Sequence, residues 1–305
     1  MNKMEQGLYP KFNVTRADGR DGNGDKHHGC DYFVLDLTHD THALPAIAAY
    51  AESCKDTYPV LSEDLRGKVA AVLAAANVFV TVPETTLPDG TIVPSFQVGK
   101  YLASEGMLKT PMVTASGKPW VNISYHKTRE ACAKAGMRLI TERQWLAIAC
   151  DIVNQDINWT GGAVGSGKVF QGLHKGTVAS AQPATFESKE PAERRWHQLS
   201  NGEIIIDFAG NAFSWVFDDV QGNVDGLLAR PVTADSISRT AAIAAGADQW
   251  REKGLGWQPT GEMGYAGRAL FRGGCFVSED HAGVFRLYRG SPDSRRNRVG
   301  FRCTK

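Results

Sequence analysis

Two short stretches, Arg272-Gly-Gly-Cys-Phe276 and Val299-Gly-Phe-Arg-Cys303, bracket the last part of this chain and decide how it folds. Both combine glycine, which permits a close approach of two backbones, with arginine and apolar residues. Between them the chemical character changes from residue to residue, with neither a helical nor a strand period. This pattern is typical of a fixed scaffold that carries a display surface. It leaves open whether that surface is a binding face or a catalytic pocket.

The composition is that of an ordinary globular protein, with 42% hydrophobic and 22% charged residues among 305. A chain of this length buries roughly three quarters of its unfolded surface, so it needs neither a metal nor a disulfide to fold. The formal net charge of +1 argues against a general nucleic-acid or membrane surface. The charge is uneven, however. Seven Arg and one Lys against three acidic residues give residues 272–305 a charge of +5, which leaves −4 for the rest.

The N-terminal residues 1–6 are polar and contain no apolar run that would act as a signal peptide. No stretch approaches the ~20 apolar residues of a membrane span. The six cysteines lie far apart without a paired CxxC spacing, which predicts free thiols. We therefore expect synthesis in the cytoplasm. A place in a virion is compatible with this, because a virion component would also lack a signal peptide.

Residues 1–77 are expected to form an N-terminal extension, followed by a single domain over residues 78–305. The extension starts with a polar, glycine-rich arm and continues with a strand-like run over residues 32–37. Two helices are predicted after it, one around residues 44–54 with apolar residues at helical spacing, and one that begins at Ser62. The domain that follows is rich in strand and turn signals.

Its predicted elements are two strands, over residues 78–82 and 92–102, and three helices, over residues 128–135, from Thr141 onward and over residues 241–250. The helix at Thr141 has the clearest signal, because Gln144 three residues later completes a capping box. The tryptophans Trp145, Trp196 and Trp215 are interpreted as core anchors rather than ligand contacts. The fold class predicted from these elements is α+β.

Six motifs along the chain carry a family resemblance. They are Phe96-Gln-Val-Gly-Lys-Tyr101, Pro119-Trp-Val-Asn-Ile-Ser124, Arg138-Leu-Ile-Thr-Glu-Arg-Gln-Trp145, Asp207-Phe-Ala-Gly-Asn-Ala-Phe-Ser-Trp215, Arg272-Gly-Gly274 and Val299-Gly-Phe-Arg302. Together they resemble the formylglycine-generating-enzyme, or sulfatase-modifying, domain over about residues 78–303. The resemblance implies a variant of the C-type lectin-like fold, here with a small N-terminal β/α-helical extension.

Within that family the chain resembles the variable proteins of diversity-generating retroelements, many of them phage-encoded. In that group the segment between RGG and GFR, here residues 272–303, is rewritten by mutagenic reverse transcription, and its side chains form a ligand-binding face. The resemblance implies that the ligand-binding residues are Cys275, Phe276, Val277, Ser278, Asp280, His281, Arg286, Tyr288, Arg289, Ser291, Asp293, Arg295, Arg296 and Arg298.

The residue types in this segment agree with that interpretation. Mutagenesis at the adenines of Asn codons does not yield Lys, Glu, Gln, Met or Trp, which make up 52 of the 305 residues. At that frequency residues 275–298 should hold about four of them, and they hold one, Glu279. The five arginines of the segment predict a preference for acidic or aromatic ligands, with an affinity that falls as salt rises.

Two other functions of the fold stay open. Formylglycine-generating enzymes look to be copper oxidases with two cysteines a few residues apart just after RGG. Here only Cys275 and Cys303 lie in that region, at opposite ends of it. A calcium-dependent, glycan-binding lectin is the second alternative, because an acidic turn places oxygen ligands at near-alternate positions. Its candidate calcium ligands are Asp218, Asp219, Asn223 and Asp225.

The sequence thus predicts a non-enzymatic protein that recognises an unidentified protein or surface ligand and is encoded by a phage or prophage. No nucleic-acid partner, no membrane span and, calcium apart, no cofactor is expected. The N-terminal extension is expected to dock to a virion, to self-associate, or simply to extend the fold.

Overall fold

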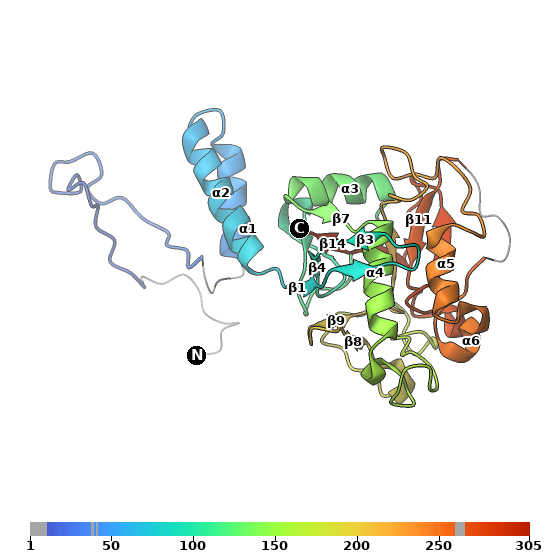
Figure 1. Cartoon of the computed structure of the whole chain (residues 1–305). Coiled ribbons are helices and arrows are strands. Elements are labelled where there is room, and N and C mark those ends of the chain that lie inside the picture. The colour runs from blue at the N-terminus through green and yellow to red at the C-terminus, as the bar shows by residue number, and fades with distance from the viewer. Residues whose placement is uncertain (1–10, 38–39, 41, 260–265) are drawn as a thin grey trace. The chain divides into compact units, whose positions relative to one another are not determined.

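The computed structural model describes residues 11–37, 40, 42–259 and 266–305 (Figure 1). The contacts within the chain divide it into two units, Met1–Val69 and Ala70–Lys305. This division falls inside a helix, and the domain boundary expected after residue 77 stays a prediction. No helix among the described residues is both long enough and apolar enough to cross a membrane.

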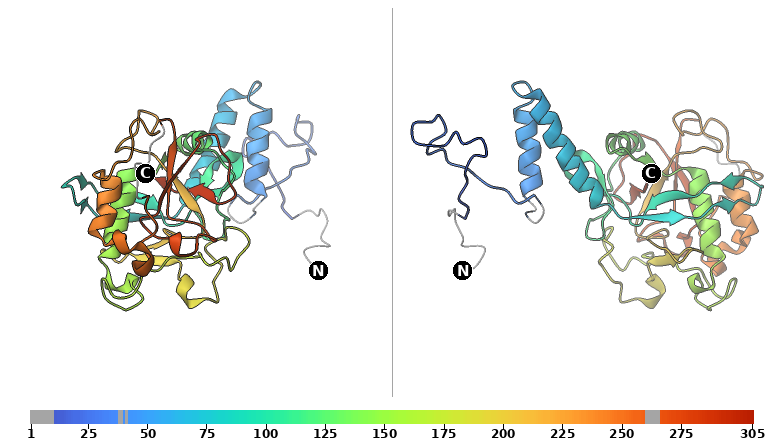
Figure 2. Two further views of the ribbon diagram at one scale, coloured as in Figure 1. Left: turned by 90° about the vertical axis from the view of Figure 1, so that its right-hand side faces the viewer. Right: turned by 60° about the vertical axis from the view of Figure 1, so that its left-hand side comes forward.

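The first unit is built on two helices, α1 (Ala43–Ser53) and α2 (Pro59–Ala75), which lie side by side (Figure 2). Where they meet, the Ser62 hydroxyl donates to the Ala51 carbonyl at 2.6 Å, and both residues are buried. Helix α2 begins at Pro59 rather than at Ser62, because a proline in the first turn lacks only an N–H that the helix does not use.

The prediction of a strand over residues 32–37 is wrong. Residues 31–36 have no regular secondary structure. A strand needs a neighbour that accepts and donates its backbone hydrogen bonds. None of the described strands pairs with this stretch. The described part of the extension therefore contains helices and irregular segments. The predicted β/α-helical extension is corrected to one without a strand among its described residues.

Two four-stranded sheets organise the second unit. The first has the order β1 (Phe79–Val82), β4 (Phe96–Gly99), β14 (Cys303–Thr304), β7 (Arg138–Leu139). The second has the order β12 (Leu287–Gly290), β11 (Ala269–Arg272), β10 (Phe213–Val216), β13 (Val299–Phe301). Three hairpin-like pairs complete the strands: β2 (Thr85–Thr86) with β3 (Ile92–Val93), β5 (Ser104–Glu105) with β6 (Pro111–Met112), and β8 (Trp196–Gln198) with β9 (Ile204–Ile206).

Strand β10 holds both ends of the C-terminal segment. On one side it pairs antiparallel with β11, where Ser214 lies opposite Arg272. On the other side it pairs parallel with β13, where the same Ser214 lies opposite Gly300. The RGG and VGFR stretches thus lie on opposite sides of β10. Residues 273–298 form a long excursion that leaves the sheet at the end of β11 and returns to it at β13. Strand β12 lies within the excursion and pairs with β11.

The helices of the second unit are α3 (Tyr125–Lys134), α4 (Glu142–Val153), α5 (Ile237–Ala244) and α6 (Trp250–Lys253), and the 3₁₀ turns are η1 (Met107–Lys109), η2 (Asp156–Asn158), η3 (Pro191–Glu193), η4 (Ala247–Gln249) and η5 (Glu279–His281). The capping box of α4 is confirmed. The Gln144 N–H donates to the Thr141 hydroxyl at 3.2 Å, and the Thr141 N–H donates to the Gln144 side chain at 3.0 Å. Helix α3 begins before residue 128 because the Ser124 hydroxyl caps it.

Two other elements differ from the expectation for local reasons. The strand predicted over residues 92–102 divides into β3 and β4, because Pro94 between them has no N–H for a ladder hydrogen bond. The helix predicted over residues 241–250 starts earlier, after the Ser236 cap. It also ends earlier, because Gly246 adopts a left-handed conformation with a φ of +88°.

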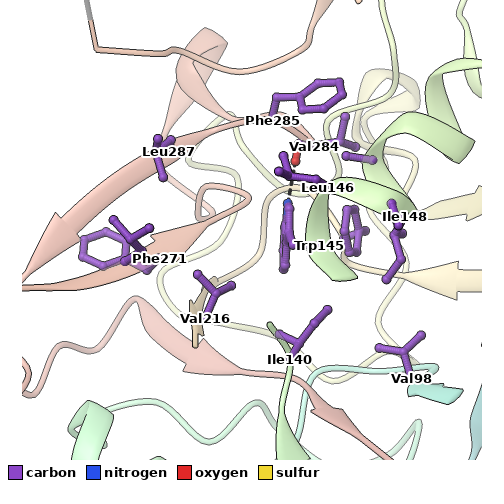
Figure 3. Close-up of a cluster of buried hydrophobic side chains, with 14 of the residues drawn as sticks. Val98, Ile140, Trp145, Leu146, Ile148, Val216, Phe271, Val284, Phe285 and Leu287 are labelled. Carbon is purple, nitrogen blue, oxygen red and sulfur yellow. Dashed lines mark hydrogen bonds between the residues drawn. The ribbon is translucent and has the colours of Figure 1, made fainter. Parts of the chain in front are cut away.

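The core of the second unit is centred on two buried tryptophans, Trp145 and Trp215. The Trp145 ring stacks on Phe208 with 4.0 Å between ring centroids, and its indole N–H donates to the Val284 carbonyl at 2.7 Å (Figure 3). Both tryptophans are core residues, as predicted. Trp196 is only half-buried and lies under the Arg194 guanidinium, 3.7 Å from its ring centroid.

Two fully buried arginines come from the motifs that bracket the C-terminal segment. Arg272 pairs with Glu142 at the start of α4, and its Nε donates to the carboxylate at 2.7 Å. Arg302 has no carboxylate partner among the described ion pairs; its Nη1 donates to the Gly99 carbonyl and its Nη2 to the Ile206 carbonyl, each at 2.6 Å. Burial lowers the pKa of Arg302 to about 10, so its side chain stays charged at neutral pH. These bonds fix the two ends of the segment to the core.

The buried ion pair gives a first prediction. Arg272→Met removes the cation and leaves the Glu142 carboxylate buried without a partner, so we expect the free energy of unfolding to fall by about 3–5 kcal/mol. Urea denaturation followed by tryptophan fluorescence measures this loss. The control is Lys127→Met, which removes an exposed ion pair with Glu130 and should cost less than about 1 kcal/mol. Equal losses in the two variants would contradict the assigned role of Arg272.

Candidate functional site

The C-terminal segment follows a path that only glycine permits at its closest approaches. Gly274 has a φ of +96°, and a Cβ there would lie 2.7 Å from the Ala282 Cα atom. A Cβ on Gly283 would lie 2.2 Å from the Gly256 nitrogen. Contacts this short do not occur between a real side chain and a backbone, so both positions require glycine. At Gly274 the segment packs against its own residue Ala282, and at Gly283 it packs against the backbone of Leu255 and Gly256.

Backbone hydrogen bonds hold the same segment to two loops of the domain. The Phe285 N–H donates to the Leu255 carbonyl at 2.9 Å, and the Trp257 N–H donates to the His281 carbonyl at 3.1 Å. At the far side of the segment the Asn122 N–H donates to the Arg296 carbonyl at 2.9 Å. The excursion is therefore tied to the scaffold along its length and not only at its ends.

A hollow of about 860 Å³ opens on this segment. Nine of the fourteen predicted ligand-binding residues line it: Cys275, Val277, Ser278, His281, Arg286, Tyr288, Arg295, Arg296 and Arg298. The structure thus brings together most of the residues that the resemblance implies. That they bind a ligand stays a prediction.

The other five predicted residues do not line the hollow. Phe276 is 3% exposed and packs in a small apolar cluster with Leu173 and Cys275. Two of the five are acidic: Asp280 pairs with Lys168 at 3.5 Å, and the exposed Asp293 lies 3.9 Å from the His126 ring. The remaining two are Arg289 and Ser291, both half-buried.

Five further residues line the hollow and were not predicted as ligand contacts: Asn122, Phe213, Phe271, Asn297 and Val299. Asn122 was not predicted because it belongs to a family motif far from the segment in the sequence. In the structure its φ of +59° is an unusual backbone conformation for a residue other than glycine. Phe213 and Phe271 lie on β10 and β11, where sequence patterns suggest only core packing.

Aromatic rings form the apolar part of the hollow. The Phe213 and Phe271 rings meet edge to face with 5.0 Å between centroids, and the Tyr288 ring lies 5.5 Å from Phe271. This arrangement is a favourable one for aromatic pairs. Tyr288 is on β12 and is exposed, with 37% of its surface accessible. The hollow therefore offers the Tyr288 ring and part of the Phe213 ring to a ligand, and the buried Phe271 supports both.

Arg286 is the most enclosed of the arginines around the hollow. Its guanidinium lies 4.4 Å from the centroid of the Trp257 ring and 5.5 Å from that of Tyr288. Burial lowers the pKa of Arg286 to about 10, so the group is still charged at neutral pH. Its Nη1 donates a long hydrogen bond of 3.4 Å to the Trp257 carbonyl, and its buried Nε has no partner among the described residues.

The residues do not fit the copper site of the oxidases. The Cys275 thiol is buried, and its Sγ lies 3.2 Å from the Ser278 hydroxyl. The Cys303 Sγ lies 3.6 Å from the Cys132 Sγ in the core. This contact and burial raise the pKa of the Cys303 thiol, which disfavours a thiolate there. Cu(I) takes soft thiolate ligands, and residues 275 and 303 do not bring two thiols to the hollow.

The turn over residues 218–225 does not form the calcium site considered above. Its oxygen atoms already accept protein hydrogen bonds: Asp218 from the backbone of Val220 and Gln221, Asp219 from the backbone of Arg143, and Asn223 from the backbone of Asp225. The fourth candidate, Asp225, pairs with Arg129 at 3.1 Å. Burial raises the pKa of both Asp218 and Asp219, which disfavours a cluster of carboxylates. In the described part of the chain, no group of three or more His, Cys, Asp or Glu side chains could hold a metal ion.

The Sulfatase-modifying factor enzyme 1-like domain family (FGE-sulfatase) matches residues 97–305. No curated protein matches the sequence.

Among solved structures, the chain is similar to the Major Tropism Determinant U1 variant, with 14% identity and a TM-score of 0.36. The match covers 68% of this chain and 50% of that one, so the chain spans about half the length of this relative. Treponema denticola variable protein 1 matches with 13% identity, 75% and 91% coverage and a TM-score of 0.35. PvdO from Pseudomonas aeruginosa matches with 12% identity, 74% and 91% coverage and a TM-score of 0.35.

The geometry of the hollow predicts which substitutions the fold tolerates. Arg295, Arg296 and Arg298 are exposed, so replacing each singly with Ser should change the free energy of unfolding by no more than about 0.5 kcal/mol. Phe285→Ala, in the same segment, removes a fully buried ring and should cost about 3–5 kcal/mol. Urea denaturation of the four variants checks this. Similar losses for the arginine and the phenylalanine variants would contradict the division of the segment into buried residues that hold its backbone and exposed residues that line the hollow.

Proposed function

This chain belongs to the family of sulfatase-modifying factor enzyme 1-like domains, and we propose that it is a non-enzymatic member that binds a ligand through its C-terminal segment. The family and the α+β, C-type lectin-like fold class predicted from the motifs are confirmed by the family match. The ligand, a protein or another surface, would contact the hollow formed by residues 275–298 and the strands beneath it.

One observation carries the proposal: the side chains around the hollow come from a segment whose backbone is fixed independently of them. The strands at both ends of the segment pair with β10, Gly274 lets the segment fold closely on itself, and Gly283 packs its middle against the backbone of Leu255 and Gly256. Side chains that project from such a backbone can change without loss of the fold. A fixed backbone also lowers the entropy that is lost on binding.

The chemistry of the hollow supports binding over the oxidase alternative. Of the thiols, only that of Cys275 lines the hollow among the described residues, and it contacts a serine rather than a second cysteine. Arginine and tyrosine, which are enriched where binding energy is concentrated, line it instead. The glycan-binding alternative has less support, because the oxygen atoms considered for calcium accept hydrogen bonds or pair with arginine within the protein.

We further propose that the segment is diversified by a retroelement, in a phage or prophage genome. Its depletion in Lys, Glu, Gln, Met and Trp supports this. The division of the segment supports it as well. Val284, Phe285 and Leu287 are fully buried and would have to stay apolar, whereas the run of residues 295–298 is exposed and free to vary.

For the N-terminal unit we propose a role in association, either with a virion or with a second copy of the chain. Its helices leave large apolar side chains exposed, which is the usual mark of an interaction surface. These are Tyr50, Tyr58, Val60 and Leu61.

Diversification predicts a definite feature of the neighbouring DNA. A near-identical template repeat of the region that encodes residues 275–298 should lie close to this gene, together with a reverse-transcriptase gene. Differences between the two copies should fall at template adenines, and mainly in codons of residues that line the hollow. Sequencing the locus checks this. A locus without a template repeat would rule out diversification, though not ligand binding.

The absence of a cysteine pair predicts that the protein does not oxidise a cysteine-containing substrate. Incubation with a cysteine-containing peptide, a copper salt and oxygen should yield no aldehyde-bearing product above that of a Cys275→Ser variant. Mass spectrometry of the peptide with an aldehyde-reactive probe measures this. Turnover that depends on both Cys275 and copper would restore the oxidase alternative.

A further inference from the structure

We infer that the ligand of the hollow is an acidic peptide segment of a partner protein, which inserts an aromatic side chain between the arginines. This inference rests on the proposed binding function and specifies the chemistry of its ligand. It depends on three features of the structure: an excess of positive charge, one enclosed guanidinium, and a second hollow that continues the first.

The charge around the hollow is not neutralised by the chain itself. Four arginines line it, namely Arg286, Arg295, Arg296 and Arg298, and no Asp or Glu is among the described residues that line it. Two aspartates of the segment, Asp280 and Asp293, are not among the residues that line the hollow; Asp280 pairs with Lys168 at 3.5 Å, and Asp293 lies 3.9 Å from the His126 ring. A ligand that brings carboxylates to this hollow therefore meets donors without competing acceptors.

Arg286 is the most suitable of the four to fix a carboxylate. Its guanidinium is stacked on Trp257, which limits its rotation and keeps its plane oriented. A pre-oriented guanidinium loses little conformational entropy when it forms a paired hydrogen bond to a carboxylate. The group is also half-buried, so that an ion pair with it is screened less by water than one at the exposed rim. Arg286 would thus anchor the ligand, and the exposed arginines would attract it.

The aromatic surface beside Arg286 favours an aromatic residue next to the acidic ones. The exposed Tyr288 and the half-buried Phe213 form this surface together with Val277, and the buried Phe271 supports them from the core side. A tyrosine or phenylalanine placed there would stack on these rings and contact the arginines through its own ring face. An acidic residue alone would leave the apolar surface uncovered.

A second hollow of about 720 Å³ adjoins the first and shares Asn122 and Arg295 with it. Lysines 109, 127 and 134 line it together with glutamates 105 and 130, so its charge is mixed but positive. Two adjoining hollows suit an extended chain better than a compact small molecule. Arg295 lies where the peptide would pass from one hollow into the other.

The test uses the full-length protein and a fluorescently labelled peptide, Glu-Glu-Tyr-Glu-Glu, with binding measured by fluorescence anisotropy. Two matched peptides replace the glutamates by glutamine or by lysine. We expect the acidic peptide to bind at least tenfold more tightly than the glutamine peptide, and the lysine peptide not to bind. The affinity for the acidic peptide should fall as the salt concentration rises.

Variants locate the site. Arg286→Gln should weaken the binding of the acidic peptide by tenfold or more, and Arg298→Gln by a few-fold. The control is Arg138→Gln, an exposed arginine of β7 outside both hollows, which should leave the affinity unchanged. Near-UV circular dichroism verifies that each variant is folded. The exposed Arg298 keeps the test decisive if Arg286→Gln does not fold.

Two results would overturn the inference. One is equal affinity for the acidic and the glutamine peptide, and the other is equal weakening by Arg286→Gln and Arg138→Gln. Failure of all three peptides to bind would overturn it too. None of these results touches the retroelement proposal, which the template repeat tests, or the absence of cysteine oxidation. Tight binding of the glutamine peptide, lost in Arg298→Gln, would retain the binding function of the hollow and reject only its acidic ligand.

Discussion

The pairing of one strand with both ends of the C-terminal segment is the constraint on which the rest of this structure depends. Ser214 of β10 has Arg272 opposite it on one side and Gly300 on the other, so an excursion of 273–298 begins and ends at the same place in the sheet. The entropy of closing this long loop is lost when the domain folds and not when a ligand binds. A long segment can therefore present a surface without being a flexible loop.

Buried charge reinforces this constraint from inside the core. Arg272 and Arg302 come from the two motifs that flank β10, and neither is exposed to solvent. Arg272 requires the carboxylate of Glu142, whereas Arg302 requires the carbonyls of Gly99 and Ile206 in two other strands. A buried charged group of this kind adds little net stability compared with apolar packing. In any other arrangement of the strands, however, the charge would be buried without hydrogen-bond partners. We interpret these arginines as groups that specify one register for the sheet.

The features that could be predicted from the sequence are those that depend on residues close together in the chain. The capping box at Thr141 and the glycines 274 and 283 follow from interactions within a few residues, or from the conformations that only glycine adopts. The pairing of β10 with β13 joins residues more than eighty positions apart, and no periodicity in either strand reveals it. For the same reason Asn122 was missed as part of the hollow. Phe276 was assigned to the display surface although it is buried, since the family motif gives the segment but not the direction of each side chain.

The same reasoning explains why an enclosed arginine without a carboxylate is informative. Burying a cation costs free energy that a native domain usually recovers through a paired anion, as Arg272 does with Glu142. Arg286 recovers only part of this through Trp257, because its Nε has no partner among the described residues and its hydrogen bond to the Trp257 carbonyl is long, at 3.4 Å. A ligand carboxylate that reaches the accessible part of the Arg286 guanidinium would add an acceptor there, so part of the gain appears on binding rather than on folding. The scaffold can carry this cost because its own stability comes from the pairing of β10 and from the core rather than from the exposed arginines of the segment. A stable scaffold with a partly satisfied cation beside an open hollow is suited to recognition.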